Sequence, residues 1–147
     1  MTYKFANLKP VILSLAIGVA WLIQCSDAQA RDMQTLTVAG GCFWCVESDF
    51  ERVPGVSEVI SGYTGGSLQN PTYENPEGHV EAVQIHYDAD QISARQLYDL
   101  FFRSIDPTDA GGQFCDRGHA YTTAIFVSNP AEQQAAEAAK SAAQAAL

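Results

Sequence analysis

The order in which strand and helix patterns alternate between residues 34 and 127 constrains the fold more than any other feature of the sequence. Apolar and polar residues alternate in four segments, and apolar residues recur with helical spacing in two others. In chain order these are a strand at 34–39, a helix at 43–53, strands at 56–61 and 80–87, a helix capped by Ser93 and a strand at 120–127. This βαββαβ order predicts an α/β (α+β) fold, a ferredoxin-like split βαβ two-layer sandwich with its helices on one sheet face.

Two polar loops interrupt this order, and we expect function there. A glycine pair at 40–41 breaks the first strand, and Ser93 with Gln96 three residues later forms a capping box for the second helix. The loops cover residues 62–78 and 106–119. They are long for a compact domain, and long loops commonly carry binding and catalytic residues.

An alanine-rich segment after the last strand predicts a further helix. Asn129 can cap it, and Pro130 suits its first helical position. The pattern has no stripe of large apolar residues and no C-terminal cap where it stops at Leu147. Two interpretations stay open: a domain, residues 31–147, that is truncated at its C-terminus, and a genuine short terminus.

The first thirty residues have the pattern of a cleavable signal peptide. Lys4 and Lys9 precede an apolar run at 11–23, and a small-x-small site at 28–30 follows. The run is shorter than the ~20 residues needed to span a bilayer. We therefore expect cleavage after residue 30 and export, to the periplasm. A retained membrane anchor and lipidation at Cys25 are the alternatives.

Composition excludes several classes of protein. Eight lysines and arginines stand against 17 aspartates and glutamates, and a net charge of −9 argues against nucleic-acid binding. The 47% of hydrophobic residues argue against intrinsic disorder, and four cysteines are too few for a disulfide scaffold of 147 residues. Signal removal would leave three cysteines, and an odd number in an oxidising compartment indicates one reactive thiol.

A reactive thiol is expected at Cys42, which follows the two glycines at the start of the first helix. The positive end of a helix and its free N–H groups favour the thiolate form of a cysteine. Cys45, three residues on, shares a helix face with Cys42, whereas Trp44 points away from the apolar stripe and suits a substrate wall. A stabilising disulfide or two buried thiols is the structural alternative.

A carboxyl group is expected on the apolar face of the third strand. Period two places Glu81 on the same face as Val83, Ile85 and Tyr87. A carboxyl there is costly to ionise, so its pKa is expected to rise, which suits a general acid. The alternative is a solvated Glu81 at the frayed start of the strand, and the period alone leaves both open.

Two alternative functions use the same cysteines. Cys115 and His119 could join Cys42 and Cys45 in a zinc site of three cysteines and one histidine, which would make the chain a zinc-stabilised binding module. The Cys-x-x-Cys pair is also typical of a thioredoxin-like disulfide oxidoreductase. Against this second alternative, no proline-marked strand follows that resembles the partner of such a site.

Six short motifs lie in order between residues 36 and 126, nearly the whole expected domain. They are Gly41-Cys42-Phe43-Trp44-Cys45-Val46-Glu47, Pro54-Gly55-Val56, Gly62-Tyr63-Thr64-Gly65-Gly66, Asn70-Pro71-Thr72-Tyr73, Gly78-His79-Val80-Glu81-Ala82-Val83 and Asp116-Arg117-Gly118-His119-Ala120-Tyr121. Together they resemble the signature of the peptide methionine sulfoxide reductase A family, whose fold is a ferredoxin-like sandwich.

The resemblance implies an oxidoreductase that reduces methionine S-sulfoxide, free or in proteins, to methionine and so repairs oxidative damage. Cys42 resembles the nucleophile that attacks the sulfoxide sulfur. Glu81 resembles the acid that protonates the sulfoxide oxygen, helped by hydroxyls at Tyr73 and Tyr121. Protonation matters because this oxygen otherwise leaves poorly. Cys42 then becomes a sulfenic acid, which a second thiol condenses to a disulfide.

The resemblance also implies the substrate contacts and the source of electrons. Phe43 and Trp44 resemble the pocket that grips the S-methyl group, and Asp116 resembles a polar group that orients the substrate. Cys45, one helical turn from the nucleophile, is the first candidate for the resolving thiol, and Cys115 is the second. We expect no metal or other cofactor, an external thioredoxin-type donor, and a monomer without nucleic-acid or membrane partners after signal removal.

Overall fold

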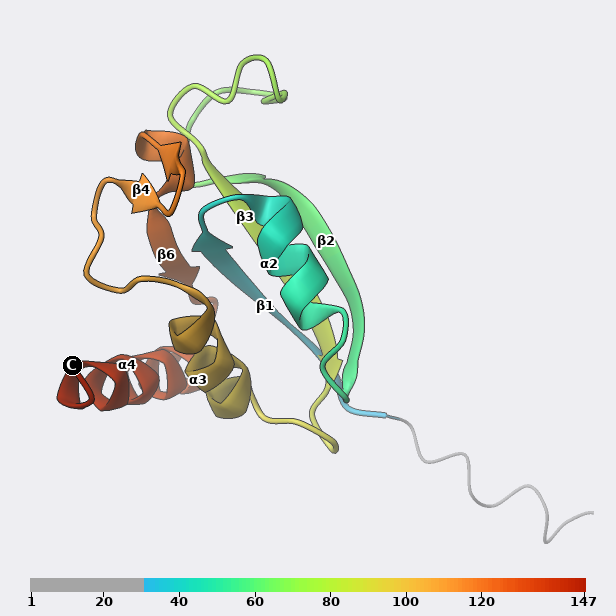
Figure 1. Ribbon diagram of the computed structural model, residues 1–147. Coiled ribbons are helices and arrows are strands. Elements are labelled where there is room, and N and C mark those ends of the chain that lie inside the picture. Colours follow the sequence, from blue (N-terminus) through green and yellow to red (C-terminus); the bar gives the residue numbers. More distant parts are fainter. Residues whose placement is uncertain (1–30) are drawn as a thin grey trace, which may run out of the picture. The chain divides into compact units, whose positions relative to one another are not determined.

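The computed structural model describes residues 31–147. Their largest element is a four-stranded antiparallel sheet with the order β2-β3-β1-β6 (Figure 1). Its strands are β1 (Met33–Gly40), β2 (Val56–Thr64), β3 (Val80–Asp88) and β6 (Thr123–Phe126). The helices are α2 (Phe43–Phe50), α3 (Ala94–Ser104) and α4 (Pro130–Ala145). Because β3 separates β1 from β2, and β1 separates β3 from β6, the predicted split βαβ sandwich is confirmed.

Helices α2 and α3 share one core with one face of the sheet, as the sequence predicts. Alternate residues of β1 and β3 point into this core, which also contains Phe50 of α2 and Leu97 of α3. The opposite face carries a smaller apolar cluster of Ala39, Val80 and Ala82. The capping box of α3 is formed as predicted.

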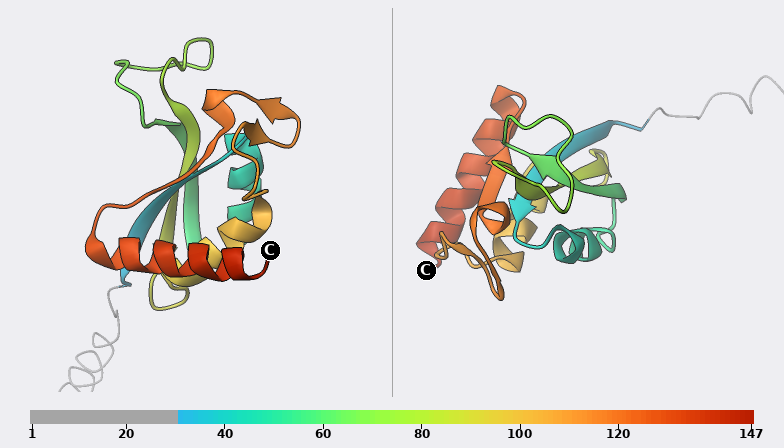
Figure 2. Two further views of the ribbon diagram at one scale, coloured as in Figure 1. Left: turned by 90° about the vertical axis from the view of Figure 1, so that its left-hand side faces the viewer. Right: turned by 90° about the horizontal axis from the view of Figure 1, so that it is seen from above.

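Helix α4 packs against α3, although it has no large apolar residues to bury (Figure 2). Its predicted cap is confirmed: the Asn129 side chain accepts a hydrogen bond from the backbone N–H of Glu132, and Pro130 occupies the first turn. Ala136 and Ala139 are buried. Small side chains at these positions let α4 join the main core.

The connection between α3 and β6 is more ordered than the predicted loop at 106–119. It contains a hairpin of β4 (Gly112–Gln113) and β5 (Asp116–Arg117), followed by the 3-10 helix η1 (His119–Tyr121). The last strand therefore begins at Thr123 and not at residue 120. Strands of two residues are too short to show alternation, so the sequence pattern did not reveal this hairpin.

Two other boundaries differ from the prediction by three residues. Helix α2 ends at Phe50 and not at residue 53, because the chain turns before Gly55, which has a φ of +95°. Strand β2 runs on to Thr64, where it still pairs with Val80 of β3. The expected signal peptide lies outside the described residues. Within residues 31–147, no helix is both long and apolar enough to cross a membrane.

Candidate active site

Cys42 is the N-cap residue of α2, directly beyond the end of β1. The turn requires glycine at Gly41, which has a φ of +87° and whose Cβ would lie 2.6 Å from that of Gln113. The Cys42 carbonyl accepts hydrogen bonds from the N–H groups of Cys45, at 3.1 Å, and Val46, at 3.2 Å. Cys42 thus begins the helix, one position before the predicted first turn.

Glu81 reaches this end of the helix from β3. Its Oε2 accepts a hydrogen bond from the backbone N–H of Phe43, at 3.0 Å. The Cys42 side chain makes no capping bond, so Glu81 satisfies an N–H group that a helix start leaves free. The Glu81 side chain is only 3% exposed. The predicted position on the buried strand face is confirmed, and the frayed, solvated alternative is wrong.

Burial raises the pKa of the Glu81 carboxyl. Desolvation is the largest cause; the bond from the Phe43 N–H acts in the opposite direction, and the nearby Asp116 raises the pKa further. Desolvation outweighs the single N–H bond because a carboxylate loses several water contacts on burial. A carboxyl that keeps its proton beside a thiol can act as a proton donor.

Tyr121 brings a hydroxyl to the same place from η1, and not from the start of the last strand as predicted. The charge of Glu81 is the largest cause that raises the pKa of Tyr121, followed by burial and then by Tyr73, Asp116 and Cys42. The packing of the elements agrees, because η1 contacts both β3 and β5. The structure thus gathers the predicted nucleophile, acid, hydroxyls and orienting carboxylate from five separate segments.

Aromatic rings form a wall beside Cys42. The rings of Trp44 and Tyr73 stack at 5.5 Å, and Phe43 lies 5.0 Å from Trp44. Trp44 is 58% exposed and Tyr73 is 57% exposed, whereas Phe43 is buried. Trp44 is therefore off the core face, as predicted, and the exposed rings present an apolar surface to solvent.

All three cysteines of residues 31–147 are free thiols. The neighbouring Cys42 side chain is the largest cause that raises the pKa of Cys45, which lies one helical turn further along α2. Cys115 is exposed in the turn of the β4–β5 hairpin, directly before Asp116. The structural alternative, a stabilising disulfide or two buried thiols, is therefore wrong for residues 31–147, since Cys45 is exposed and Cys42 is half-buried.

The zinc alternative is wrong in its geometry. Within residues 31–147 no three histidine, cysteine, aspartate or glutamate side chains gather closely enough to hold a metal ion. The His119 Nε2 instead lies 3.3 Å from the Gly78 carbonyl oxygen. Cys42, Cys45, Cys115 and His119 therefore do not form the predicted ligand set.

Tyr63 belongs to the same cluster, although sequence reasoning gave it no role. It lies directly opposite Glu81 in the β2–β3 pairing, and its ring is 5.5 Å from that of Phe43. Its hydroxyl is buried and has no hydrogen-bond partner. The signal was available, because period two along β2 places Val59, Ser61 and Tyr63 on one face.

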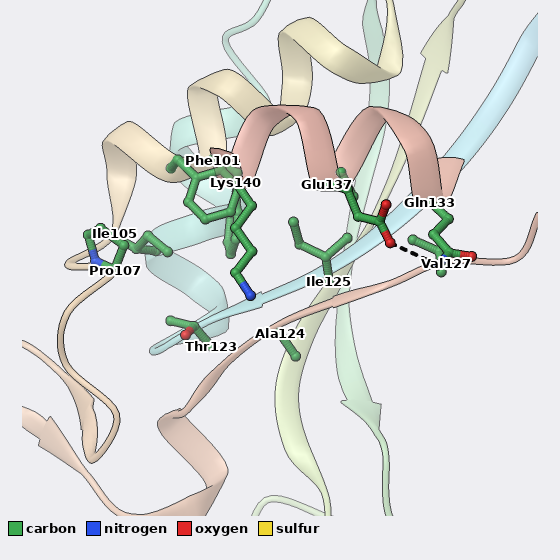
Figure 3. A pocket seen from close by; sticks show the side chains of 12 residues that line it. Phe101, Ile105, Pro107, Thr123, Ala124, Ile125, Val127, Gln133, Glu137 and Lys140 are labelled. Atoms are coloured by element: carbon green, nitrogen blue, oxygen red, sulfur yellow. Dashed lines mark hydrogen bonds between the residues drawn. The ribbon is translucent and has the colours of Figure 1, made fainter. Parts of the chain in front are cut away.

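A groove of about 610 Å³ opens at another part of the fold, between α3, α4 and β6 (Figure 3). Ile125 and Val127 line this groove. Gln133 and Glu137 of α4 line it too, and the Gln133 amide donates a hydrogen bond to the Glu137 carboxylate. None of the cysteines and none of the residues around Glu81 line it. The groove is therefore separate from the candidate active site.

Comparisons with known proteins agree with this site. The family model for peptide methionine sulfoxide reductase matches residues 34–147. Peptide methionine sulfoxide reductase MsrA 2 of Rhizobium meliloti is 53% identical over 122 residues, which is 82% of this chain and 62% of that protein. The chain spans 61–64% of the length of the first curated relatives that it matches.

Solved structures show the same fold. Methionine sulfoxide reductase A of Corynebacterium diphtheriae matches with a TM-score of 0.69 and 30% identity over 80% of this chain and 57% of that one. Mxr1 from Saccharomyces cerevisiae in complex with Trx2 matches with a TM-score of 0.55 and 25% identity over 79% and 68%. The thioredoxin-like alternative is therefore wrong as a fold. The chain belongs to the peptide methionine sulfoxide reductase family.

Proposed function

We propose that this chain is a peptide-methionine (S)-S-oxide reductase that reduces methionine S-sulfoxide, free or protein-bound, and so repairs oxidative damage. One observation carries the proposal: the buried Glu81 carboxyl bonds to the N–H of the residue after Cys42. An acid and a thiol therefore meet at one helix end. The family membership and the names of the relatives support the same reaction.

The first step transfers the sulfoxide oxygen to Cys42. Its thiolate attacks the sulfoxide sulfur and forms a sulfur–sulfur bond, while Glu81 gives its proton to the oxygen. The hydroxyl then moves to the Cys42 sulfur: a sulfur–oxygen bond to Cys42 forms, and both the sulfur–oxygen bond of the substrate and the sulfur–sulfur bond break. The products are methionine, a sulfenic acid on Cys42 and the Glu81 carboxylate. The sulfoxide sulfur is reduced and the Cys42 sulfur is oxidised by the same two electrons.

The surrounding groups hold the substrate for this step. Phe43 and Trp44 supply an apolar wall for the S-methyl group, which agrees with the exposed ring of Trp44. Tyr73 and Tyr121 help to bind the sulfoxide oxygen through their hydroxyls. Asp116 orients the polar part of the substrate from the β4–β5 hairpin.

Cys45 is proposed to resolve the sulfenic acid, with Cys115 as the second candidate. The position of Cys45, one helical turn from Cys42, favours Cys45. The exposed position of Cys115 beside Asp116 supports the alternative. A thioredoxin-type donor then reduces the disulfide, a proposal motivated by the yeast Mxr1–Trx2 complex. No metal or other cofactor takes part.

We further propose that residues 1–30 are a signal peptide that directs the chain to the periplasm, where residues 31–147 act as a monomer. The basic start and apolar run of this segment support export. The N-terminal sequence of the protein recovered from periplasm tests this. An N-terminus at residue 31 is expected, and an intact Met1 would contradict it.

Conversion of methionine S-sulfoxide to methionine tests the function. Wild-type protein with a thiol reductant is expected to convert it, and Cys42→Ser is expected to be inactive. Conversion at the wild-type rate by Cys42→Ser would reject Cys42 as the nucleophile. Without reductant, peptide mapping after one turnover is expected to find a Cys42–Cys45 disulfide. A Cys42–Cys115 disulfide, with Cys45→Ser recycling normally, would assign resolution to Cys115.

A further inference from the structure

The hydroxyl of Tyr63 is buried beside Glu81 and has no acceptor. The two residues are direct partners across β2 and β3, so their side chains leave the sheet side by side toward α2. Both residues also contact Phe43. The Glu81 carboxyl accepts a hydrogen bond from the Phe43 backbone N–H, and the Tyr63 ring packs against the Phe43 ring. A buried hydroxyl without a partner costs stability, and that of Tyr63 lies on the residue directly opposite the candidate acid.

The Glu81 carboxyl offers an acceptor for this hydroxyl. In the described residues, Oε2 accepts from Phe43 and Oε1 has no hydrogen-bond partner. Oε1 is not completely buried, so it is the carboxyl oxygen that faces the site. Once the proton has left, the carboxylate has stronger acceptor oxygens and only one protein donor. Tyr63, the direct cross-strand partner of Glu81, carries a buried hydroxyl donor that has no acceptor.

We propose that Tyr63 is a positioning residue for Glu81, whose hydroxyl donates a hydrogen bond to the Glu81 carboxylate that remains after proton transfer. This inference rests on the proposed reductase function. The proton moves from Glu81 to the sulfoxide oxygen, and Tyr63 keeps its own proton throughout. The hydrogen bond stabilises the charged product of that step, so it makes Glu81 a better proton donor.

The titratable groups around this pair come from several elements. They are Asp116 of β5, Tyr121 of η1, Tyr73 and Glu74 of the β2–β3 loop, and Cys42 at the start of α2. Burial raises the pKa of Tyr63, and the charge of Glu81 is the next largest cause. Tyr63 therefore stays protonated as a donor when Glu81 ionises. Asp116 repels the Glu81 carboxylate, which increases the need for a donor.

Tyr63→Phe removes the hydroxyl and keeps the ring. Tyr98→Phe is a matched control, because the Tyr98 hydroxyl is also buried without a partner but lies in α3, in the main core. Carbon-13 NMR titration of the Glu81 carboxyl, without substrate, measures the proposed contact directly. We expect Tyr63→Phe to raise the pKa of Glu81 and Tyr98→Phe to leave it unchanged.

Single-turnover rates over a pH range give the second measurement. The rate is expected to fall where Glu81 loses its proton. In Tyr63→Phe this fall should move to higher pH, and the rate below it should decrease about tenfold, because the weaker acid donates less readily. Tyr98→Phe should keep the wild-type profile.

The outcomes separate the two proposals. An unchanged Glu81 titration in Tyr63→Phe, or an equal change in Tyr98→Phe, would overturn the role of Tyr63. A wild-type protein that converts no methionine S-sulfoxide would instead reject the reductase function. The titration does not depend on turnover, so it still decides whether Tyr63 bonds to the Glu81 carboxylate.

Discussion

The side of β3 that faces α2 and α3 has two ends that are equally buried and chemically different. Toward one end Val83, Ile85 and Tyr87 are at most 1% exposed, and the Tyr87 hydroxyl donates to Gln34 at 3.1 Å. At the other end Glu81 is also almost fully buried, yet it carries a carboxyl whose pKa burial raises. Burial alone therefore does not separate packing from chemistry in this fold.

Hydrogen bonding makes the difference between the ends. The Tyr87 hydroxyl has an acceptor, whereas Tyr63, opposite Glu81, does not. The Tyr87 end is built for stability. The Glu81 end keeps a costly acid and an unpaired donor beside the start of α2, which is expected where structure serves a reaction. Variants at the two ends should therefore affect different measurements.

The largest effect is expected at the Glu81 end. Glu81→Gln keeps the side-chain volume and an oxygen that can accept from Phe43, but the amide has no acidic proton to give. We expect the single-turnover rate of sulfoxide reduction to fall by ~10²–10⁴. Stopped-flow or quench measurements at neutral pH check this. An unchanged rate would make Glu81 a structural residue.

The opposite pattern is expected at Ile85, which packs in the core opposite Leu36 and Val59. Ile85→Ala leaves a cavity and should lower the free energy of unfolding by about 2–5 kcal/mol. Denaturant titration measures this. The single-turnover rate of the folded protein should stay at the wild-type value. A loss of rate without a loss of stability would contradict the assignment of Ile85 to the stabilising end of β3.

The pH dependence of stability sharpens the comparison further. Folded Glu81 has a raised pKa, so it holds its proton at pH values where the unfolded chain has lost it. Its contribution to stability is therefore present below the ordinary glutamate pKa of about 4.3 and is lost as pH rises through the folded pKa. Relative to Glu81→Gln, wild type should lose stability across this window. A constant difference between the two unfolding free energies would contradict the raised pKa.

A small effect is expected far from both ends, at the cap of α3. The Ser93 hydroxyl accepts from the N–H of Gln96, and Gln96 returns a bond to the Ser93 N–H. Ser93→Ala should destabilise the fold by about 1 kcal/mol. Thermal unfolding measures the loss, and the reduction rate serves as a control that should not change.

Much of the fold follows from patterns that are local in the chain. The βαββαβ order predicts the sheet order, and period two along β3 predicts that Glu81 is buried. These two predictions succeed because successive side chains of a strand point to opposite faces of the sheet, and only one face packs against the helices. The β4–β5 hairpin and η1 cannot be predicted in this way, because they are too short for a periodic pattern of apolar residues. They depend on contacts with distant segments, such as that of Gln113 with Gly41.

The sequence singles out candidate site residues one by one, but it does not give their arrangement. The resemblance singled out Cys42, Glu81 and Asp116, yet the hydrogen bond from Phe43 to Glu81 joins residues 38 positions apart. Period two along β2 could have placed Tyr63 on the core face, but its unpaired hydroxyl is a property of the folded neighbourhood and not of a sequence pattern. The proximity of Cys42 and Cys45 along α2 is the exception, since helical spacing alone predicts it.

The fate of the sulfoxide oxygen tests the central claim most directly. Protein that carries Cys45→Ser and Cys115→Ser together keeps Cys42 as the single cysteine of residues 31–147. It would be mixed, without reductant, with methionine S-sulfoxide labelled by a heavy oxygen isotope and then analysed by peptide mass spectrometry. We predict one methionine for each protein molecule and the labelled oxygen on the Cys42 sulfur. Methionine formed while Cys42 remains an unmodified thiol would contradict the account.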